Sequence, residues 1–261
     1  MITVKTKEQI EMMKIAGSIV AETLELIEKY AKPGISTLTL DKIAHEYIIS
    51  RGAKPSFLHY NGFPGVICTS VDDVVVHGFP STKVLEEGQI LSIDCGAIYK
   101  GWHGDAARTI AIGKISPEKQ KLIDVTKQSF YEGIKDLKEG SRIGDIGSKV
   151  QKYAEKFGYG VVRDFVGHGI GRQMHEDPSV PNYGYAGTGI KLKAGNTIAI
   201  EPMINMGSHE VRINGWDHRT RDGKPSAHYE NTVLITEDGC EILTQVSPEG
   251  REILTRKLEA E

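Results

Sequence analysis

The sequence predicts a single α/β domain built from two similar halves, because one pattern of helices followed by strands occurs twice along the chain. The segment LEEGQILSID, residues 85–94, matches LKAGNTIAIE, residues 192–201, with leucine, glycine, isoleucine and the terminal acid in register. A nearly equal offset superimposes Gly34 on Gly140, Leu40 on Ile146, Tyr47 on Tyr153 and Gly52 on Gly158. Internal similarity of this kind indicates one site assembled between two related halves.

Each half is expected to form two helices and then strands, with residues 114–120 (KISPEKQ) joining halves of about 1–115 and 116–250. An amphipathic first helix ending near Pro33-Gly34 is indicated by apolar residues that recur at three- and four-residue steps. These residues are Ile10, Met13, Ala16, Ile19, Val20, Leu24 and Ile27. We therefore interpret residues 1–261 as one catalytic domain, large enough to enclose an enzyme site.

Composition excludes several classes of protein. Hydrophobic residues make up 39% and charged residues 26%, as in an ordinary globular chain, and the formal net charge of -3 disfavours strong nucleic-acid binding. Charged residues interrupt every apolar run near the N-terminus, which excludes a signal peptide or membrane span there. Three cysteines without CxxC spacing indicate a reducing compartment. We expect a cytoplasmic protein that reads no nucleic acid and enters no membrane.

The repeated strands place two acids in equivalent positions, each predicted to end its β-rich run. Alternation puts Ser92 and Asp94 on one face of the first strand, and Ala199 and Glu201 on one face of the second. Two carboxylates buried toward a shared interior cost several kcal/mol each, on the order given by ion desolvation, unless positive charge compensates them. A metal is the simplest source of that charge.

Further candidate ligands are Asp105 in WHGDAART, His168 in VGHGIGR and Glu230 in SAHYENT. With Asp94 and Glu201 they supply four carboxylates and one imidazole, a ligand set suited to two divalent ions. A hydroxide bridging two such ions is a nucleophile at neutral pH, so the expected chemistry is hydrolysis. A structural zinc site would need four Cys or His ligands, which these segments do not offer.

Five segments taken together resemble the methionine aminopeptidases, over about residues 5–247. They are HGFP, the Asp94–Asp105 pair, GHGIGRQMHEDP, the Ile-Glu201-Pro run and the Tyr-Glu230-Asn-Thr segment. The resemblance implies the pita-bread fold, a curved antiparallel sheet flanked by helices with pseudo-two-fold symmetry. No long insertion separates His168 from Glu201 and no zinc-finger extension precedes residue 1, so the similarity is to the short bacterial type 1 form.

The resemblance also implies roles. Asp94 would be a terminal ligand, Asp105 and Glu230 bridging ligands, and His168 and Glu201 ligands of the second ion, with Glu201 accepting a proton from the attacking water. His77 and His175 would contact the substrate beside the scissile peptide. The methionine side chain would be held by apolar and polarisable residues. Those residues are Tyr60, Phe63, Cys68, Met174 and Trp216.

Other histidines and cysteines fit simpler explanations. We expect surface positions or satisfied core positions for His45, His59, His103, His209, His218 and His228, of which His59 and His103 are near-site candidates. Cys68 and Cys95 lack the neighbouring base that a cysteine nucleophile requires.

Two alternatives remain open: a proline-specific peptidase (Xaa-Pro aminopeptidase or prolidase), and a catalytically inactive pita-bread protein that binds a peptide or RNA. The first usually carries an extra N-terminal domain, and the second usually loses metal ligands. Removal of the initiator methionine before a small second residue is the favoured function. The resemblance implies two divalent ions (Co, Mn, Fe or Zn), nascent polypeptide N-termini at the ribosome as partners, and a monomer.

Overall fold

The computed structural model describes residues 2–259, so Met1 and residues 260–261 of the expected domain lie outside the described part. The helices are α1 (Lys7–Tyr30), α2 (Thr37–Ser50), α3 (Pro117–Ile134), α4 (Ile143–Glu155) and α5 (Pro248–Glu259), with a short 3₁₀ turn at Tyr60–Gly62. The strands of the first half of the chain are β1 (Lys54–Pro55), β2 (Ile67–Val71), β3 (Val74–Val76), β4 (Ile90–Tyr99) and β5 (Trp102–Ala111). The later strands are β6 (Gly160–Val161), β7 (Gly167–Gly169), β8 (Glu176–Val180), β9 (Thr197–Ile200), β10 (Met203–Asn205), β11 (Val211–Asn214), β12 (Asp217–Thr220), β13 (Ser226–His228), β14 (Glu230–Ile235) and β15 (Cys240–Ile242).

Helix starts follow local capping chemistry. The Thr6 hydroxyl accepts a hydrogen bond from the Gln9 backbone N–H, and the Gln9 side chain accepts one from the Thr6 N–H, so α1 begins in a capping box. Its last residue, Tyr30, lies just before Pro33, which confirms the predicted end of this helix. Ser116 caps α3 and is followed by Pro117, so the expected joint at 114–120 contains the start of a helix.

One large sheet dominates the molecule. Its strands follow the order β1-β4-β5-β14-β9-β7-β8, with β2 also paired to β4 and β15 to β14, and every pairing is antiparallel. Two smaller sheets have the orders β13-β10-β6 and β11-β12-β3. Two helices precede β4 and β5 along the chain, and two more precede β9 and β14.

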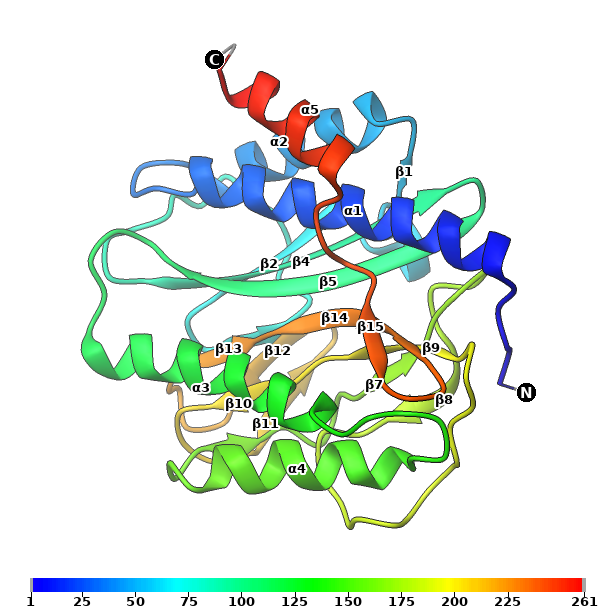
Figure 1. Ribbon diagram of the computed structural model, residues 1–261. Helices are drawn as coiled ribbons and strands as arrows, with labels where there is room; N and C mark the ends of the chain where they lie inside the picture. Colours follow the sequence, from blue (N-terminus) through cyan, green and yellow to red (C-terminus); the bar gives the residue numbers. More distant parts are fainter. Residues whose placement is uncertain (1, 260–261) are drawn as a thin grey trace.

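Helices cover the strands from two sides. Figure 1 shows α1, α2 and α5 together on one side of the molecule and α3 and α4 on the other, with the strands between them. Helices α1 and α2 of the first group enclose a core that includes Ile19, Leu40 and Leu91. The second group, α3 and α4, encloses a separate core of residues such as Phe130 and Val233. Burial of these apolar faces holds the large sheet in place beneath the site.

Helix α1 lies unusually close to the sheet because of two glycines. A Cβ on Gly104 of β5 would lie 2.7 Å from the backbone nitrogen of Gly17 in α1. A Cβ on Gly17 would lie 2.2 Å from the carbonyl oxygen of Leu243. Neither contact is sterically possible, so glycine at both positions permits α1 to press directly on the strand that carries Asp105.

The expectation that both repeated acids end their strands is wrong for Asp94. Asp94 does not end its strand, because β4 continues to Tyr99 and pairs with β5 up to the Tyr99–Trp102 rung. Glu201 does follow directly after the last residue of β9. The difference arises because β4 and β5 form a hairpin longer than the repeated segment, closed by Lys100 and Gly101, both of positive φ. Within residues 2–259, no helix is long and apolar enough to cross a membrane.

Candidate active site and metal centre

The five predicted ligands come from five strands that are neighbours in the large sheet. Asp94 lies on β4, Asp105 on β5, Glu230 on β14 and His168 on β7, and Glu201 follows β9. The order of these strands in the sheet is β4-β5-β14-β9-β7. Asp94 and Glu230, which are 136 positions apart in sequence, are thereby brought to the two strands that flank β5.

Strand register places all five side chains on one face. Asp94 and Glu230 both pair with Ala107, so these three residues form one row across the sheet. Asp105 lies two residues from Ala107 and therefore points the same way. His168 and Thr232 both pair with Ala199, two residues before Glu201, which extends the same face to the remaining ligands. Alanines between the acids leave the space above the sheet open.

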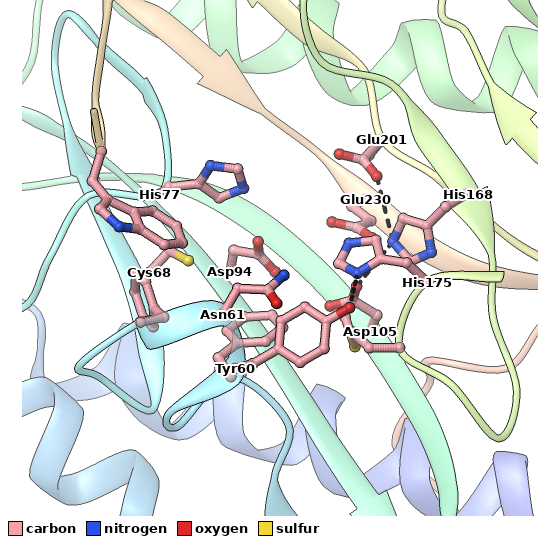
Figure 2. Close-up of a pocket in the computed structure, with 14 residues that line it drawn as sticks. Tyr60, Asn61, Cys68, His77, Asp94, Asp105, His168, His175, Glu201 and Glu230 are labelled. Carbon is pink, nitrogen blue, oxygen red and sulfur yellow. Dashed lines mark hydrogen bonds and ion pairs between the residues drawn. The ribbon is translucent and has the colours of Figure 1, made fainter. Parts of the chain in front are cut away.

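A single pocket contains every residue that the sequence analysis assigned to the site (Figure 2). Its lining is Phe57, Tyr60, Asn61, Phe63, Cys68, His77, Asp94, Asp105, His168, Met174, His175, Glu201, Trp216 and Glu230. Phe57 and Asn61 were not among the sequence candidates, because no motif distinguishes them. We call Asp94, Asp105, His168, Glu201 and Glu230 the acidic end of the pocket. We call Tyr60, Phe63, His77 and Trp216, with Phe79 packed behind Phe63 and Trp216, the aromatic end.

The acidic end holds polar atoms that no protein group satisfies. Asp105 and Glu230 are 3% and 1% exposed, yet Asp94 Oδ1, Asp105 Oδ1 and Glu230 Oε1 have no hydrogen-bond partner. Buried carboxylate oxygens are nearly always hydrogen-bonded or bound to a cation. Burial raises the pKa of all four carboxyl groups well above their usual range, and repulsion from neighbouring carboxylates raises it further. The cluster therefore needs positive charge to remain ionised at neutral pH.

His168 is oriented as a metal ligand requires. Its Nδ1 donates to the backbone carbonyl of Gly169 at 2.8 Å, so Nε2 of the neutral ring carries the lone pair. Nε2 lies 3.6 Å from Asp105 Oδ2 and 3.7 Å from Glu201 Oε1, too far for strong hydrogen bonds but suitable for donors that share one ion. Burial and the neighbouring His175 ring lower the pKa of His168 to about 3, which keeps this nitrogen unprotonated.

The expectation that His228 is a surface or satisfied core histidine is wrong. The residue is 2% exposed, and its Nε2 has no hydrogen-bond partner. That nitrogen lies 3.4 Å from Glu230 Oε2 and 3.9 Å from Glu201 Oε2, so it faces the acidic end. Burial lowers its pKa to about 3. Its position two residues before Glu230 was the available signal, because strand alternation puts i and i+2 on one face.

The other histidines without motif context differ among themselves. His103 is buried with its Nδ1 bonded to Ser56 Oγ at 3.0 Å, and His218 is buried with both ring nitrogens bonded, so both are satisfied core residues as expected. His59 is exposed and caps the short 3₁₀ turn in a left-handed conformation.

His175 stands between the two ends of the pocket. Its Nδ1 lies 2.8 Å from the Tyr60 hydroxyl, and its ring stacks on the Tyr60 ring with centroids 5.4 Å apart. The His168 and His175 ring centroids are 4.2 Å apart. The loop that carries His175 is pinned on the other side, where Lys5 forms a 3.0 Å ion pair with Glu176. Burial lowers the pKa of His175, so the ring is neutral near pH 7.

The aromatic end is assembled from loops. Phe63, Phe79 and Trp216 contact one another with ring centroids 5.3–5.7 Å apart. Met174 and Cys68 pack with Phe57 and Phe63 in a small apolar cluster next to the acids. Burial and the nearby carboxylates raise the pKa of the Cys68 thiol, which makes it a poor nucleophile. The three cysteines are all free thiols.

The residues present fit a divalent metal centre. Asp105, His168 and Glu230 can each direct one ligand atom into a common space, and so can Asp94, His228 and Glu230, with the ligand atoms of each group within 4.8 Å of one another. Carboxylate oxygens mixed with imidazole nitrogen suit Mn, Fe, Co or Zn. The unpartnered buried oxygens and the lone pair on His168 have no other evident role.

This fold and this cluster define a metal-dependent hydrolase, and comparison with known proteins agrees. The profile of metallopeptidase family M24 matches residues 11–237, so the chain belongs to that family. Membership implies the use of divalent metal.

Within the family, the chain is similar to the methionine aminopeptidase of Clostridium acetobutylicum, with 55% identity over 94% of this chain and 99% of that protein. The crystal structure of methionine aminopeptidase from Rickettsia prowazekii superimposes with a TM-score of 0.92 at 43% identity, covering 94% of this chain and all of that one. These similarities confirm the predicted pita-bread fold.

A prolidase from Pyrococcus furiosus shares the fold at a TM-score of 0.74 and 26% identity. The match covers 94% of this chain but 66% of the prolidase chain. The sequence and structural similarity is therefore much closer to the methionine aminopeptidases than to this proline-specific relative.

Proposed function

We propose that this protein removes the N-terminal methionine from polypeptides by metal-dependent hydrolysis. The observation that carries the proposal is the junction of two environments in one pocket: unpaired carboxylates of the acidic end lie directly beside the apolar cluster of Cys68, Met174 and Phe63. An apolar, polarisable wall suits a thioether side chain. A substrate methionine in that wall would have its carbonyl carbon next to the acids.

Two divalent ions would be held by the acidic end. Asp94 would bind one ion, Asp105 and Glu230 would bridge both, and His168 and Glu201 would bind the other. When bound, such ions supply Lewis-acid polarisation and make water a nucleophile at neutral pH. We propose Co, Mn, Fe or Zn, since this mixed ligand set accepts each of them.

The chain's own groups would carry the proton and orient the peptide. Glu201 would take the proton of the attacking water, because its carboxylate projects into the pocket beside the other ligands (Figure 2). His175, whose Nδ1 can accept from the Tyr60 hydroxyl, would then present an Nε2–H donor to the oxygen that gains negative charge. His77 would face the amide nitrogen that leaves.

Selection for a small second residue follows from where that residue must lie. It would sit between the acidic end and the rim formed by His77 and Trp216, whose rings are 5.9 Å apart. A bulky β-branched side chain there would displace the scissile bond from the catalytic groups, and misplacement lowers kcat/KM directly.

The proposal extends to the substrates, the compartment, the oligomeric state and the domain organisation of the protein. We infer that nascent polypeptide N-termini are the substrates, encountered in the cytoplasm at the ribosome. We also infer that the protein acts as a monomer and that its single catalytic domain derives from two similar halves. The parallel order of elements, two helices before each pair of ligand-bearing strands, supports the last inference.

A peptide panel tests the proposed function. Metal-free protein is supplied with one metal at a time and given Met-Gly-Met-Met, Met-Ile peptides and Xaa-Pro peptides. We expect cleavage after Met in the first peptide and little in the second. Cleavage confined to Xaa-Pro peptides would instead identify a proline-specific enzyme. Binding of peptides without any turnover would identify an inactive relative.

A further inference from the structure

His77 reaches the pocket from an unusual backbone position and is held by a second histidine. It follows β3 with φ of 61°, a left-handed conformation that costs a non-glycine residue free energy. Its Nδ1 lies 3.1 Å from Nδ1 of His218, a buried residue of β12. The two strands are directly paired at Val76 and His218, so the contact is built into the sheet.

The hydrogen bonds of this pair fix where the protons are. Nε2 of His218 lies 3.0 Å from the backbone carbonyl oxygen of Gly215, which can only accept, so this nitrogen carries the proton. Nδ1 of a neutral His218 ring is then an acceptor. The proton between the two rings must therefore belong to Nδ1 of His77. A neutral His77 ring protonated at Nδ1 has its lone pair on Nε2.

The surroundings keep this arrangement rigid. Phe165 packs against both rings, with centroids 5.5 Å from His77 and 4.7 Å from His218. Trp216 contacts the His77 ring edge to face at 5.9 Å. Among the described residues, Nε2 of His77 has no hydrogen-bond partner, and the ring points into the pocket in Figure 2. The free nitrogen is the one available to substrate.

We propose that His218 is a positioning residue that holds His77 in the Nδ1–H tautomer, so that His77 offers substrate a hydrogen-bond acceptor. This inference rests on the proposed peptidase function. An acceptor matches a peptide N–H and cannot stabilise an oxyanion, so His77 serves the amide nitrogen of the scissile bond. The donor role toward the carbonyl oxygen falls to His175 alone. The chemistry recognised by His77 is thus an N–H group next to the cleaved bond.

A pair of substitutions separates hydrogen bonding from packing. In His218→Asn the side-chain oxygen takes the place of Nδ1 and can still accept from His77, whereas His218→Leu has a similar shape and no acceptor. With zinc-loaded, ¹⁵N-histidine-labelled protein, two-bond ¹H–¹⁵N spectra report the tautomer of each ring, and the signal lost in His77→Gln identifies His77. We expect Nδ1–H in the wild type and in His218→Asn, and a mixed or Nε2–H tautomer in His218→Leu.

The kcat/KM for Met-Gly-Met-Met should change in parallel with the tautomer of His77. Residues that orient metal ligands from behind typically contribute about 10- to 100-fold, and the same kind of hydrogen bond orients His77, so we expect His218→Leu to lose about tenfold or more in kcat/KM and His218→Asn to recover most of it. An Nε2–H tautomer in the wild type overturns the proposal even if His218→Leu does not fold. Unchanged kcat/KM in a folded His218→Leu variant overturns it as well. Failure of the wild type to cleave the peptide refutes the proposed function, while the tautomer is measured independently.

Discussion

The acidic and aromatic ends of the pocket are held in different ways. The acidic end stands on five adjacent strands of one sheet, where register and alternation set the direction of every side chain. The aromatic end stands on turns, and His77, together with His59 and Asn61 on either side of Tyr60, has positive φ although none of them is glycine. Metal chemistry demands fixed ligand distances, which a sheet supplies. Recognition of a peptide uses side chains that loops present and neighbouring rings hold in place.

The largest expected effect is loss of a carboxylate at the acidic end. Glu230→Gln keeps the shape of a fully buried side chain but removes a bridging charge, so turnover should fall by more than about 10²-fold, beyond the usual effect of an outer-shell change. Metal content, measured by mass spectrometry of purified protein, should fall with it. Glu210→Gln on the exposed surface is the matched control. Full activity in a metal-depleted Glu230→Gln protein would contradict the role of the acidic end.

Substitution of His175 tests whether this residue acts on the substrate or binds metal at the acidic end. His175→Ala removes the proposed donor to the developing oxyanion, and kcat should fall by roughly 10²-fold or more while metal content stays unchanged. Tyr60→Phe, which removes the hydroxyl but keeps a stacked ring, should lose less. Collapse of metal binding in His175→Ala would show instead that His175 belongs to the acidic end as a ligand.

Substitution of His228 tests whether this buried histidine belongs to the acidic end. Its Nε2 faces Glu230 and Glu201 without a protein partner, so it is expected to support the metal centre. His228→Gln should weaken metal affinity by roughly tenfold, as measured by isothermal titration of metal-free protein. His209→Gln, in the turn after β10, provides the control. Equal affinity in both variants would show that His228 only packs.

Stability of the metal-free protein should reveal the repulsion among the acids. Because burial and neighbouring carboxylates raise the pKa of Asp94, ionising it destabilises the folded state as pH rises above the ordinary carboxyl pKa near 4. Metal-free Asp94→Asn should therefore melt above the wild type at pH 7, by roughly 2–4 °C for each kcal/mol of repulsion relieved. The difference should vanish below about pH 4, where Asp94 is protonated in both states. A pH-independent difference would contradict this explanation.

The contrast between ligands on strands and aromatic residues on turns also explains which features the sequence could predict. The acidic end was predictable because strand alternation relates Asp94 to Ser92 and Glu201 to Ala199 without knowledge of the fold, and the family resemblance supplied the rest. The extent of β4 was not predictable, since pairing with β5 carries the hairpin past the repeated segment. His218 could not be assigned because its partner, His77, is 141 residues away in sequence, whereas His228 could have been assigned from its place two residues before Glu230. A strand pairing brings His218 to His77, and no local pattern records that contact.

One measurement tests the central claim most directly: activity on Met-Gly-Met-Met during titration of metal-free protein with a single divalent metal. If the acidic end is the catalytic centre, metal-free protein is inactive, and activity rises with added metal to a plateau by two equivalents per chain. The Glu230→Gln protein should remain inactive over the same range. Full peptidase activity in wild-type protein shown to be metal-free would contradict the account.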